Sequence, residues 1–257
     1  MGYGTAILII LVVGLAAAAV TLVVQKAVAT DLRREHHEVG STVFLQLGVI
    51  FAVLLAFVFS EAWGEYNEAS AAINSEVAAL HGAAMLAATL PSPSAKEILG
   101  KEKVYLNSVV DEEWPVMAAH RTENIPTDRK LRALIQAAAN LKSDGAESFT
   151  KPEMLSLLTQ AHAQREVRIY QAGSGIPTAL WTVLIGFELI LVAFVVLSGL
   201  RFWTTAALVS GIFAASVSSI LVVARLLDFP FEGALALSSH DFVTVTTKVT
   251  ELLATVG

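Results

Sequence analysis

Hydrophobic residues gather in four long runs, and polar residues fill the stretches between them. The runs extend from Thr5 to Val24, Val43 to Ser60, Ile176 to Gly199 and Trp203 to Ala224. A helix needs roughly 18–20 mainly apolar residues to cross a bilayer, and each run is near or above that length. Glu188 is the one acidic or basic residue inside the runs. The pattern therefore predicts four transmembrane helices.

The long stretch between the second and third runs predicts a bundle of helices. It is rich in Ala, Leu, Glu and Lys and lacks alternating β-branched residues, so strands are not expected. The second span has no breaker before Pro91 and is expected to continue as one helix to about Thr89. Three more helices are expected. The first runs from a Ser94 cap to about His120, and Pro115 should kink it or limit its length. The second runs from a Thr127 cap to Ser143, and the third from about Pro152 to Tyr170.

The last of these helices is expected to turn Leu155, Leu158, His162 and Ile169 inward. After the fourth span, Asp228 to Gly233 predicts a turn, and a short amphipathic helix is expected from about Asp241. We expect this tail helix to dock on the bundle through Phe242, Val245, Val249 and Leu252. The fold class is thus an all-α integral membrane protein, with four transmembrane helices and a large helical insert between spans two and three. The expected parts are 1–62 (spans one and two), 63–175 (a helical domain continuous with span two), 176–226 (spans three and four) and 227–257 (turn and tail helix).

Composition and charge limit the classes of function. The chain has 257 residues, of which 55% are hydrophobic, and a net charge of −6. Between Glu61 and Arg168 we count eleven Lys/Arg and fifteen Asp/Glu, and this acidity argues against nucleic acid as a partner. The absence of cysteine excludes disulfides and thiolate chemistry, and it leaves the redox compartment open.

The charges near the spans predict an orientation in the cell membrane. Met1 to Gly4 has no basic residue, so the first run is expected to be a retained span rather than a secretory signal. The positive-inside rule compares basic residues near the span ends on the two faces, and it favours an extracytoplasmic helical domain. The two sets are Lys26, Arg33, Arg34 and Arg201 on one face, and Arg165, Arg168 and Arg225 on the other.

Several short motifs in order along the chain resemble those of the bestrophin-like domain family, a bacterial and plant membrane family. The motifs are His37-Glu38-Val39-Gly40, Ala52-Val53-Leu54-Leu55-Ala56-Phe57-Val58, Trp63, Asp111-Glu112-Glu113-Trp114-Pro115, Gly175-Ile176-Pro177 with Trp181, and Asp228 with Pro230-Phe231 and Gly233. The resemblance implies a four-span topology with a large insert. By the family's name, it also implies an ion channel.

Three carboxylates are expected on one helical face where span two leaves the membrane. Glu61, Glu65 and Glu68 lie at i, i+4 and i+7. In a homo-oligomer with span two near the axis, they would form acidic rings that concentrate cations and repel anions. The alternative is an ordinary solvated face.

Polar residues inside the spans are also candidates for an ion pathway. Glu188 lies about halfway through span three, with Ser210 and Ser216 as its expected partners at similar depth. It could relay ions or protons, or it could join two helices as a hydrogen-bonded group without a role in transport. Gln46 is the other strongly polar side chain within the spans. A small-residue stripe in span four, Gly211, Ala214, Ala215 and Ser218, predicts close helix packing within or between subunits.

The remaining clusters give weaker signals. Asp111, Glu112 and Glu113 could make divalent-ion contacts, although salt bridges or helix ends are the simpler use. His36, His37 and Glu38, with Asp31 and Glu35 nearby, could bind a metal, but no separated third ligand set accompanies them, so an interfacial polar loop is favoured. The sequence thus predicts no resident metal, no cofactor and no enzymatic activity.

The sequence as a whole predicts a homo-oligomeric ion channel that prefers cations. Its expected partners are the lipid bilayer, inorganic ions and further copies of the chain. Anion conduction, by analogy with the family name, is a variant of this prediction. The alternative from another class is a membrane-anchored sensor or scaffold that binds a partner through its helical domain.

Overall fold

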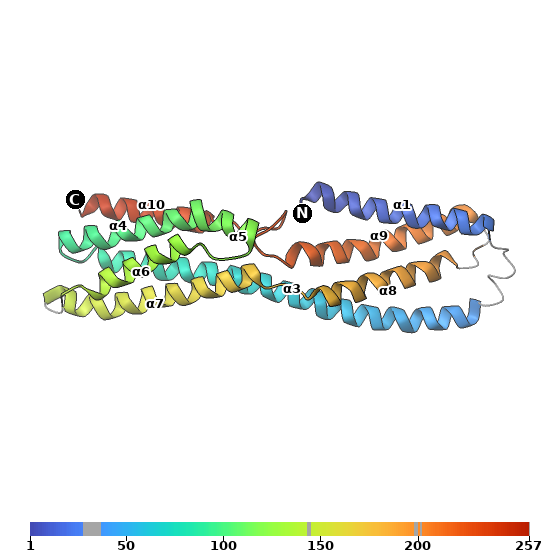
Figure 1. The fold of residues 1–257 in the computed structure, drawn as a ribbon, viewed down its shortest axis with the longest axis horizontal. Coiled ribbons are helices and arrows are strands. Elements are labelled where there is room, and N and C mark those ends of the chain that lie inside the picture. Colours follow the sequence, from blue (N-terminus) through green and yellow to red (C-terminus); the bar gives the residue numbers. More distant parts are fainter. Residues whose placement is uncertain (28–36, 143–144, 198–199, 201, 257) are drawn as a thin grey trace. The chain divides into compact units, whose positions relative to one another are not determined.

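The helical prediction agrees with the computed structural model of the chain. The structure describes residues 1–257 except 28–36, 143–144, 198–199, 201 and 257, and the side chains of residues 37–40 and 145–147 also lie outside the description. All regular elements in the described ranges are helices (Figure 1). They are α1 (Tyr3–Ala27), α3 (His37–Ala87), α4 (Ser92–Ser108), the π-helix η1 (Val109–Glu113), α5 (Trp114–His120), α6 (Ile125–Ala139), α7 (Gly145–Gly173), α8 (Thr178–Val196), α9 (Trp203–Leu227) and α10 (His240–Thr255).

Four of these helices are long and apolar enough to cross a membrane. They contain the segments Tyr3–Ala27, Ser41–Ala87, Thr178–Val196 and Trp203–Leu227, each of which overlaps one of the four hydrophobic runs. α3 continues far beyond its span and ends at Ala87, two residues before the predicted end.

The chain divides into two compact units. We call residues Met1–Gly64 and Gly175–Asp228 the membrane unit, and residues Glu65–Ser174 and Phe229–Gly257 the helical unit. α3 contributes its first part to the membrane unit and its second part to the helical unit.

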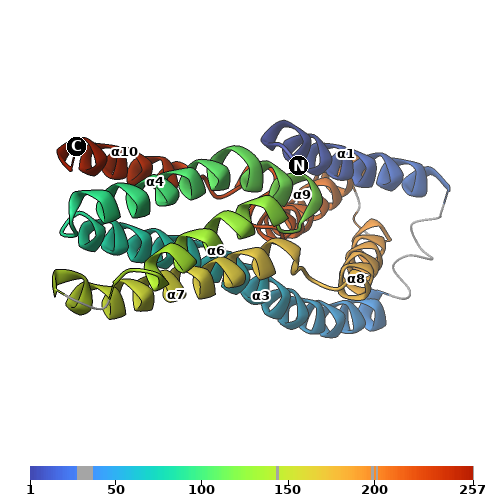
Figure 2. The same ribbon diagram turned by 60° about the vertical axis from the view of Figure 1, so that its left-hand side comes forward.

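In the membrane unit, α1 packs closely along α9 (Figure 1, Figure 2). A Cβ atom added to Gly14 would lie 3.0 Å from the carbonyl oxygen of Gly211, and one added to Gly211 would lie 3.1 Å from that of Gly14. Only glycine at both positions allows the two backbones this approach. Next to this contact, the hydroxyl groups of Thr21 and Ser210 form a hydrogen bond of 2.5 Å. Gly211 and Ala215 of the small-residue stripe thus lie against Gly14 of α1 within one subunit.

In the helical unit, α4 lies beside both α6 and α10, and α6 lies beside α7. Phe242, Val245 and Val249 of α10 are buried in the hydrophobic core, as expected for a docked tail helix. Trp114 of α5 packs edge-on against Phe231 and Phe242. The tail helix begins at His240, one residue before its predicted start.

Several predicted helix ends are wrong by a few residues. α4 begins at Ser92 after Pro91 rather than at a Ser94 cap. The cap of α6 is Asn124, whose side-chain oxygen accepts a hydrogen bond from the Thr127 backbone at 3.0 Å, and Thr127 itself is helical. α7 begins at Gly145, so Pro152 lies inside it. Asx side chains and prolines tolerate more than one position near a helix start, and the sequence alone does not choose among them.

Pro115 does not end its helix, and the reason lies in the preceding turn. Proline lacks an N–H and clashes with the carbonyl group four residues earlier in a regular α-helix. The chain instead makes the single π-helical turn η1, in which the Trp114 N–H bonds to the Val109 carbonyl oxygen five residues back. This shift by one residue lets the helix continue through Pro115 into α5.

Candidate functional site

The three residues of the acidic stripe of α3 differ in their surroundings. Glu61 is exposed. Half-buried Glu65 accepts a hydrogen bond of 2.9 Å from the Ser174 hydroxyl, and Glu68 accepts one of 2.8 Å from the Gln171 amide. Both donors are neutral, so neither hydrogen bond cancels a carboxylate charge.

The face of α3 that carries Glu61 is open along the membrane-spanning part of the helix. Gln46, Ile50 and Phe57 are exposed, and Phe57 has 69% of its surface accessible. At 100° per residue, all three lie within about 60° of Glu61 around the helix axis. Phe51, Leu55 and Val58, which lie about 60–120° from Glu61 in the other direction around the axis, are buried. A polar Gln46 side chain on an open face within a span calls for water or another protein surface beside it.

Glu188 of α8 is bound to the neighbouring helix within the membrane unit. It is 9% exposed and accepts a short hydrogen bond from the Ser218 hydroxyl of α9. The predicted partners Ser210 and Ser216 are wrong. Ser210 bonds to Thr21, and the register between α8 and α9, which depends on the turn between them, places Ser218 beside the carboxyl group instead.

The three side chains of the acidic cluster lie on η1 and differ in exposure and in their partners. The cluster consists of Asp111, Glu112 and Glu113. Asp111 is exposed. Glu112 pairs with Lys130 at 2.7 Å, and this hydrogen bond lowers the pKa of its carboxyl group. Glu113 is fully buried and bonded to Arg165 and Arg168. Two of the three carboxylates therefore already have cationic partners, and divalent-ion binding by the three stays a prediction.

A buried ion-pair cluster joins four helical elements of the helical unit. Its members are Glu76 of α3, Glu113 of η1, and Arg165 and Arg168 of α7, all with fully buried side chains. Arg168 lies 2.8 Å from Glu76 and 2.9 Å from Glu113, and Arg165 lies 2.5 Å from Glu113. The hydroxyl group of Tyr105 on α4 donates to Glu76 at 2.6 Å.

The electrostatics of this cluster favour the charged form of Arg168. Burial lowers the pKa of Arg168, but the carboxylates of Glu76 and Glu113 outweigh burial and raise that pKa above its ordinary value. Burial, together with the Glu76 charge, raises the pKa of Tyr105 well above its usual range, so its hydroxyl group stays a donor. Loss of one partner from such a cluster would leave an unpaired buried charge, which is strongly destabilising.

The spacing of Arg165 and Arg168 along α7 indicates this cluster, but the predicted inner stripe of the helix does not include them. The buried residues of α7, among those whose side chains are described, are Met154, Leu158, Ala161, Arg165, Arg168, Gln171 and Ala172. The predicted stripe was offset from these residues, and His162 and Ile169 are only half-buried. Arg165 and Arg168 continue the helical spacing of Leu158 and Ala161. Two arginines at inward positions of a helix require buried acidic partners.

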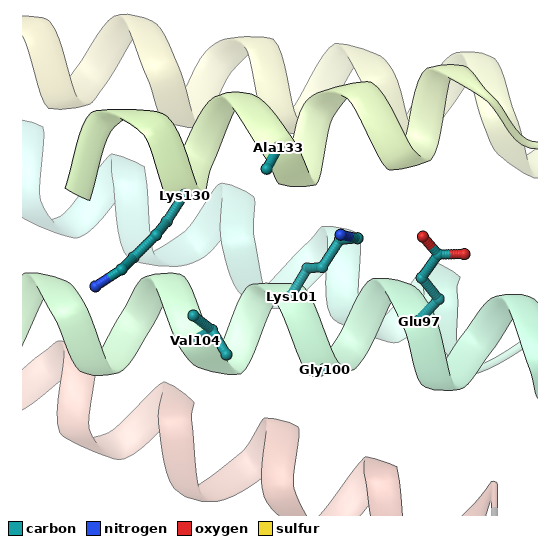
Figure 3. A pocket seen from close by; sticks show the side chains of 6 residues that line it. All are labelled: Glu97, Gly100, Lys101, Val104, Lys130 and Ala133. Atoms are coloured by element: carbon teal, nitrogen blue, oxygen red, sulfur yellow. The ribbon is translucent and has the colours of Figure 1, made fainter. Parts of the chain in front are cut away.

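A shallow hollow of about 450 Å³ lies between α4 and α6 (Figure 3). Its described lining is Glu97, Gly100, Lys101, Val104, Lys130 and Ala133. The Lys130 ammonium group is held by Glu112 and by the Ser108 hydroxyl at 2.8 Å. Lys101 and Glu97 are one turn apart on α4, so their charges offset each other. These six residues include no hydroxyl, thiol or imidazole group, and we assign the hollow no chemistry.

The proposed metal ligands around His36 fall outside the part of the chain that is described. His36, Asp31 and Glu35 lie in the segment that is left out, and the side chains of His37 and Glu38 are left out as well. Metal binding by these residues therefore stays a prediction from the sequence.

Comparison with known proteins identifies the family and supports the fold. Two crystal structures of single-substitution variants of a bacterial bestrophin homolog from Klebsiella pneumoniae are similar to this chain, each with a TM-score of 0.76 and 14% sequence identity. One covers 99% of this chain and 99% of the homolog, and the other covers 95% and 99%. No curated protein sequence matches the chain.

These similarities, with the four candidate spans, confirm the predicted fold class of an all-α integral membrane protein. At this level of identity they bear on the fold alone. The sequence itself matches the bestrophin-like domain over residues 11–242, which is most of its length. The chain therefore belongs to the bestrophin-like domain family.

Proposed function

We propose that the chain assembles into a homo-oligomeric ion channel that prefers cations, with the open face of α3 along the pathway. Family membership supports conduction. The observation that supports the cation preference is that the Glu61 carboxyl group is exposed and that Ser174 and Gln171, which donate hydrogen bonds to Glu65 and Glu68, are neutral.

The open face of α3 has the two features that a selective pore needs. Its acidic end would present a ring of carboxylates, one from each subunit, that raises the local concentration of cations. Its apolar part, with Ile50 and Phe57, would form a constriction at which water and ions are least stable. Each carboxylate about 8 Å from a permeating ion contributes roughly 0.5 kcal/mol in water, and a ring multiplies this by the number of subunits.

The direct test is the charge of Glu61. We expect Glu61→Gln to lower the cation-to-anion permeability ratio several-fold, and Glu61→Lys to invert the preference, because the ring charge changes by one or two units per subunit. The reversal potential across planar bilayers with a KCl gradient measures this ratio. Glu97→Lys, at an exposed position of α4, is the matched control and should leave the ratio unchanged.

Two results would contradict the proposal. An unchanged reversal potential for both Glu61 variants would remove the selectivity assignment. Absence of ion flux through the purified wild-type protein in liposomes would remove the channel itself and support the membrane-anchored scaffold instead.

Glu188 provides a separate test within the membrane unit. We propose that its carboxyl group contributes to the pathway through its contact with Ser218, and we expect Glu188→Gln to alter the single-channel conductance or its pH dependence. Ser218→Ala, which removes only the hydrogen-bond donor, is the companion variant. If Glu188→Gln conducts like the wild type at every pH from 5 to 8, the carboxyl group serves only to join α8 to α9.

A further inference from the structure

The geometry points to a binding site for a divalent transition-metal ion on the helical unit, formed by Asp128, His162 and Glu166. One ligand atom from each residue lies within 4.8 Å of the other two. His162 and Glu166 are four residues apart on α7, so they share one face of that helix, and Asp128 on α6 faces them. These three residues are not part of the acidic stripe, and the site does not depend on conduction.

The donor set indicates the class of metal. One imidazole nitrogen and two carboxylate oxygens suit zinc, cobalt(II) or nickel, whereas calcium and magnesium prefer oxygen donors alone. Ligand atoms around a tetrahedral zinc ion at 2.0–2.2 Å are about 3.4 Å apart, so small side-chain rotations close the present spacing. Asp128 is buried, His162 is half-buried and Glu166 is exposed, which leaves an open side for water as the fourth ligand.

The ion-pair network around the site has a net negative formal charge, which favours a divalent cation. The ion pairs around Arg165 link five carboxylates with three guanidinium groups, which gives a formal charge of −2 for the network. The carboxylates are those of Glu76, Glu113, Glu123, Asp128 and Glu166, and the guanidinium groups are those of Arg132, Arg165 and Arg168. A bound divalent ion would bring this formal charge to zero.

Arg165 does not close the site, although it contacts two of the ligands. Its short contact is with Glu113 at 2.5 Å, whereas Asp128 and Glu166 lie 3.3 and 3.2 Å away. Asp128 also pairs with Arg132 at 2.7 Å. A carboxylate has about four lone-pair positions, so Asp128 can keep both arginine contacts, and Glu166 its one, and still bind a metal. His162 has no hydrogen-bond partner among the described residues, which leaves its ring free to turn toward the metal.

Titration of the purified full-length protein with zinc, after treatment with a chelator, tests the site. We expect one zinc ion per chain by calorimetry. Cobalt in its place should give a visible absorption band typical of nitrogen and oxygen ligands. We expect His162→Gln and Glu166→Gln each to weaken zinc binding at least tenfold. Glu166 is exposed, so Glu166→Gln reports on binding even if His162→Gln impairs folding, and circular dichroism monitors the fold of both.

The controls separate this site from other histidines. His240→Gln, at an exposed position of α10, and the double variant His36→Gln, His37→Gln should bind zinc as the wild type does. Absence of stoichiometric zinc binding by the wild type would overturn the proposal. So would unchanged affinity in the folded Glu166→Gln variant, or loss of binding in the His36, His37 double variant.

Discussion

Arg168→Met is expected to destabilise the helical unit by about 3–5 kcal/mol, the usual cost of breaking a buried ion pair from one side. The substitution removes the cation that lies between Glu76 and Glu113. Among the described residues, it leaves Glu76 with the Tyr105 hydroxyl group as its one remaining partner. Methionine fills similar volume, so the loss reflects unpaired charge rather than a cavity. Denaturant unfolding of the purified protein, followed by helical circular dichroism, measures the change.

Arg132→Met is the matched control for this experiment. Arg132 makes an ion pair of 2.7 Å with Asp128, but 70% of its side chain is exposed. Exposed pairs contribute about 0–1 kcal/mol, so the same substitution should have little effect here. Equal unfolding midpoints for the two variants would show that the buried cluster does not hold the helical unit together.

The membrane-spanning part of the fold was predictable because it depends only on the number and length of the apolar runs in the sequence. Four runs of apolar residues suffice to define four spans, whatever they pack against. The continuation of span two to Ala87 followed from the absence of any breaker before Pro91. The passage of the helix through Pro115 did not follow, since it depends on a π-helical turn that no residue preference specifies.

The candidate sites were predictable only in part, because pairing between helices depends on register. Glu188 could be recognised from its depth in span three, but its partner Ser218 could not. The arginines at positions 165 and 168 were counted as charges near a membrane face, whereas both are buried in ion pairs. The closeness of Asp128 to His162 likewise required the packing of α6 against α7.

Glu102 is expected to make the helical unit less stable as the pH rises. Its side chain on α4 is fully buried, and among the described residues neither carboxyl oxygen has a hydrogen-bond partner. Burial raises the pKa of this carboxyl group well above the ordinary value of 4.5. The folded protein therefore holds a proton that the unfolded chain releases above about pH 4.5.

The sign of the effect follows from this difference in bound protons. Above pH 4.5 the folded state binds more protons than the unfolded state, so stability falls as the pH rises, by up to about 1.4 kcal/mol per pH unit, until the folded pKa is reached. Glu102→Met removes the titrating group and keeps an apolar side chain of similar length. We expect this variant to be more stable than the wild type at pH 8, with a smaller difference at pH 5.

Unfolding midpoints measured from pH 5 to pH 8 test this expectation, with Glu97→Met as the control on the same helix. Glu97 is exposed, so its removal should leave the pH dependence of the wild type intact. If the Glu102→Met and wild-type proteins lose stability in parallel over this range, then the pH dependence arises elsewhere. If Glu102→Met is less stable than the wild type at every pH, then the carboxyl group has a stabilising partner. In that case burial alone does not determine how Glu102 contributes to stability.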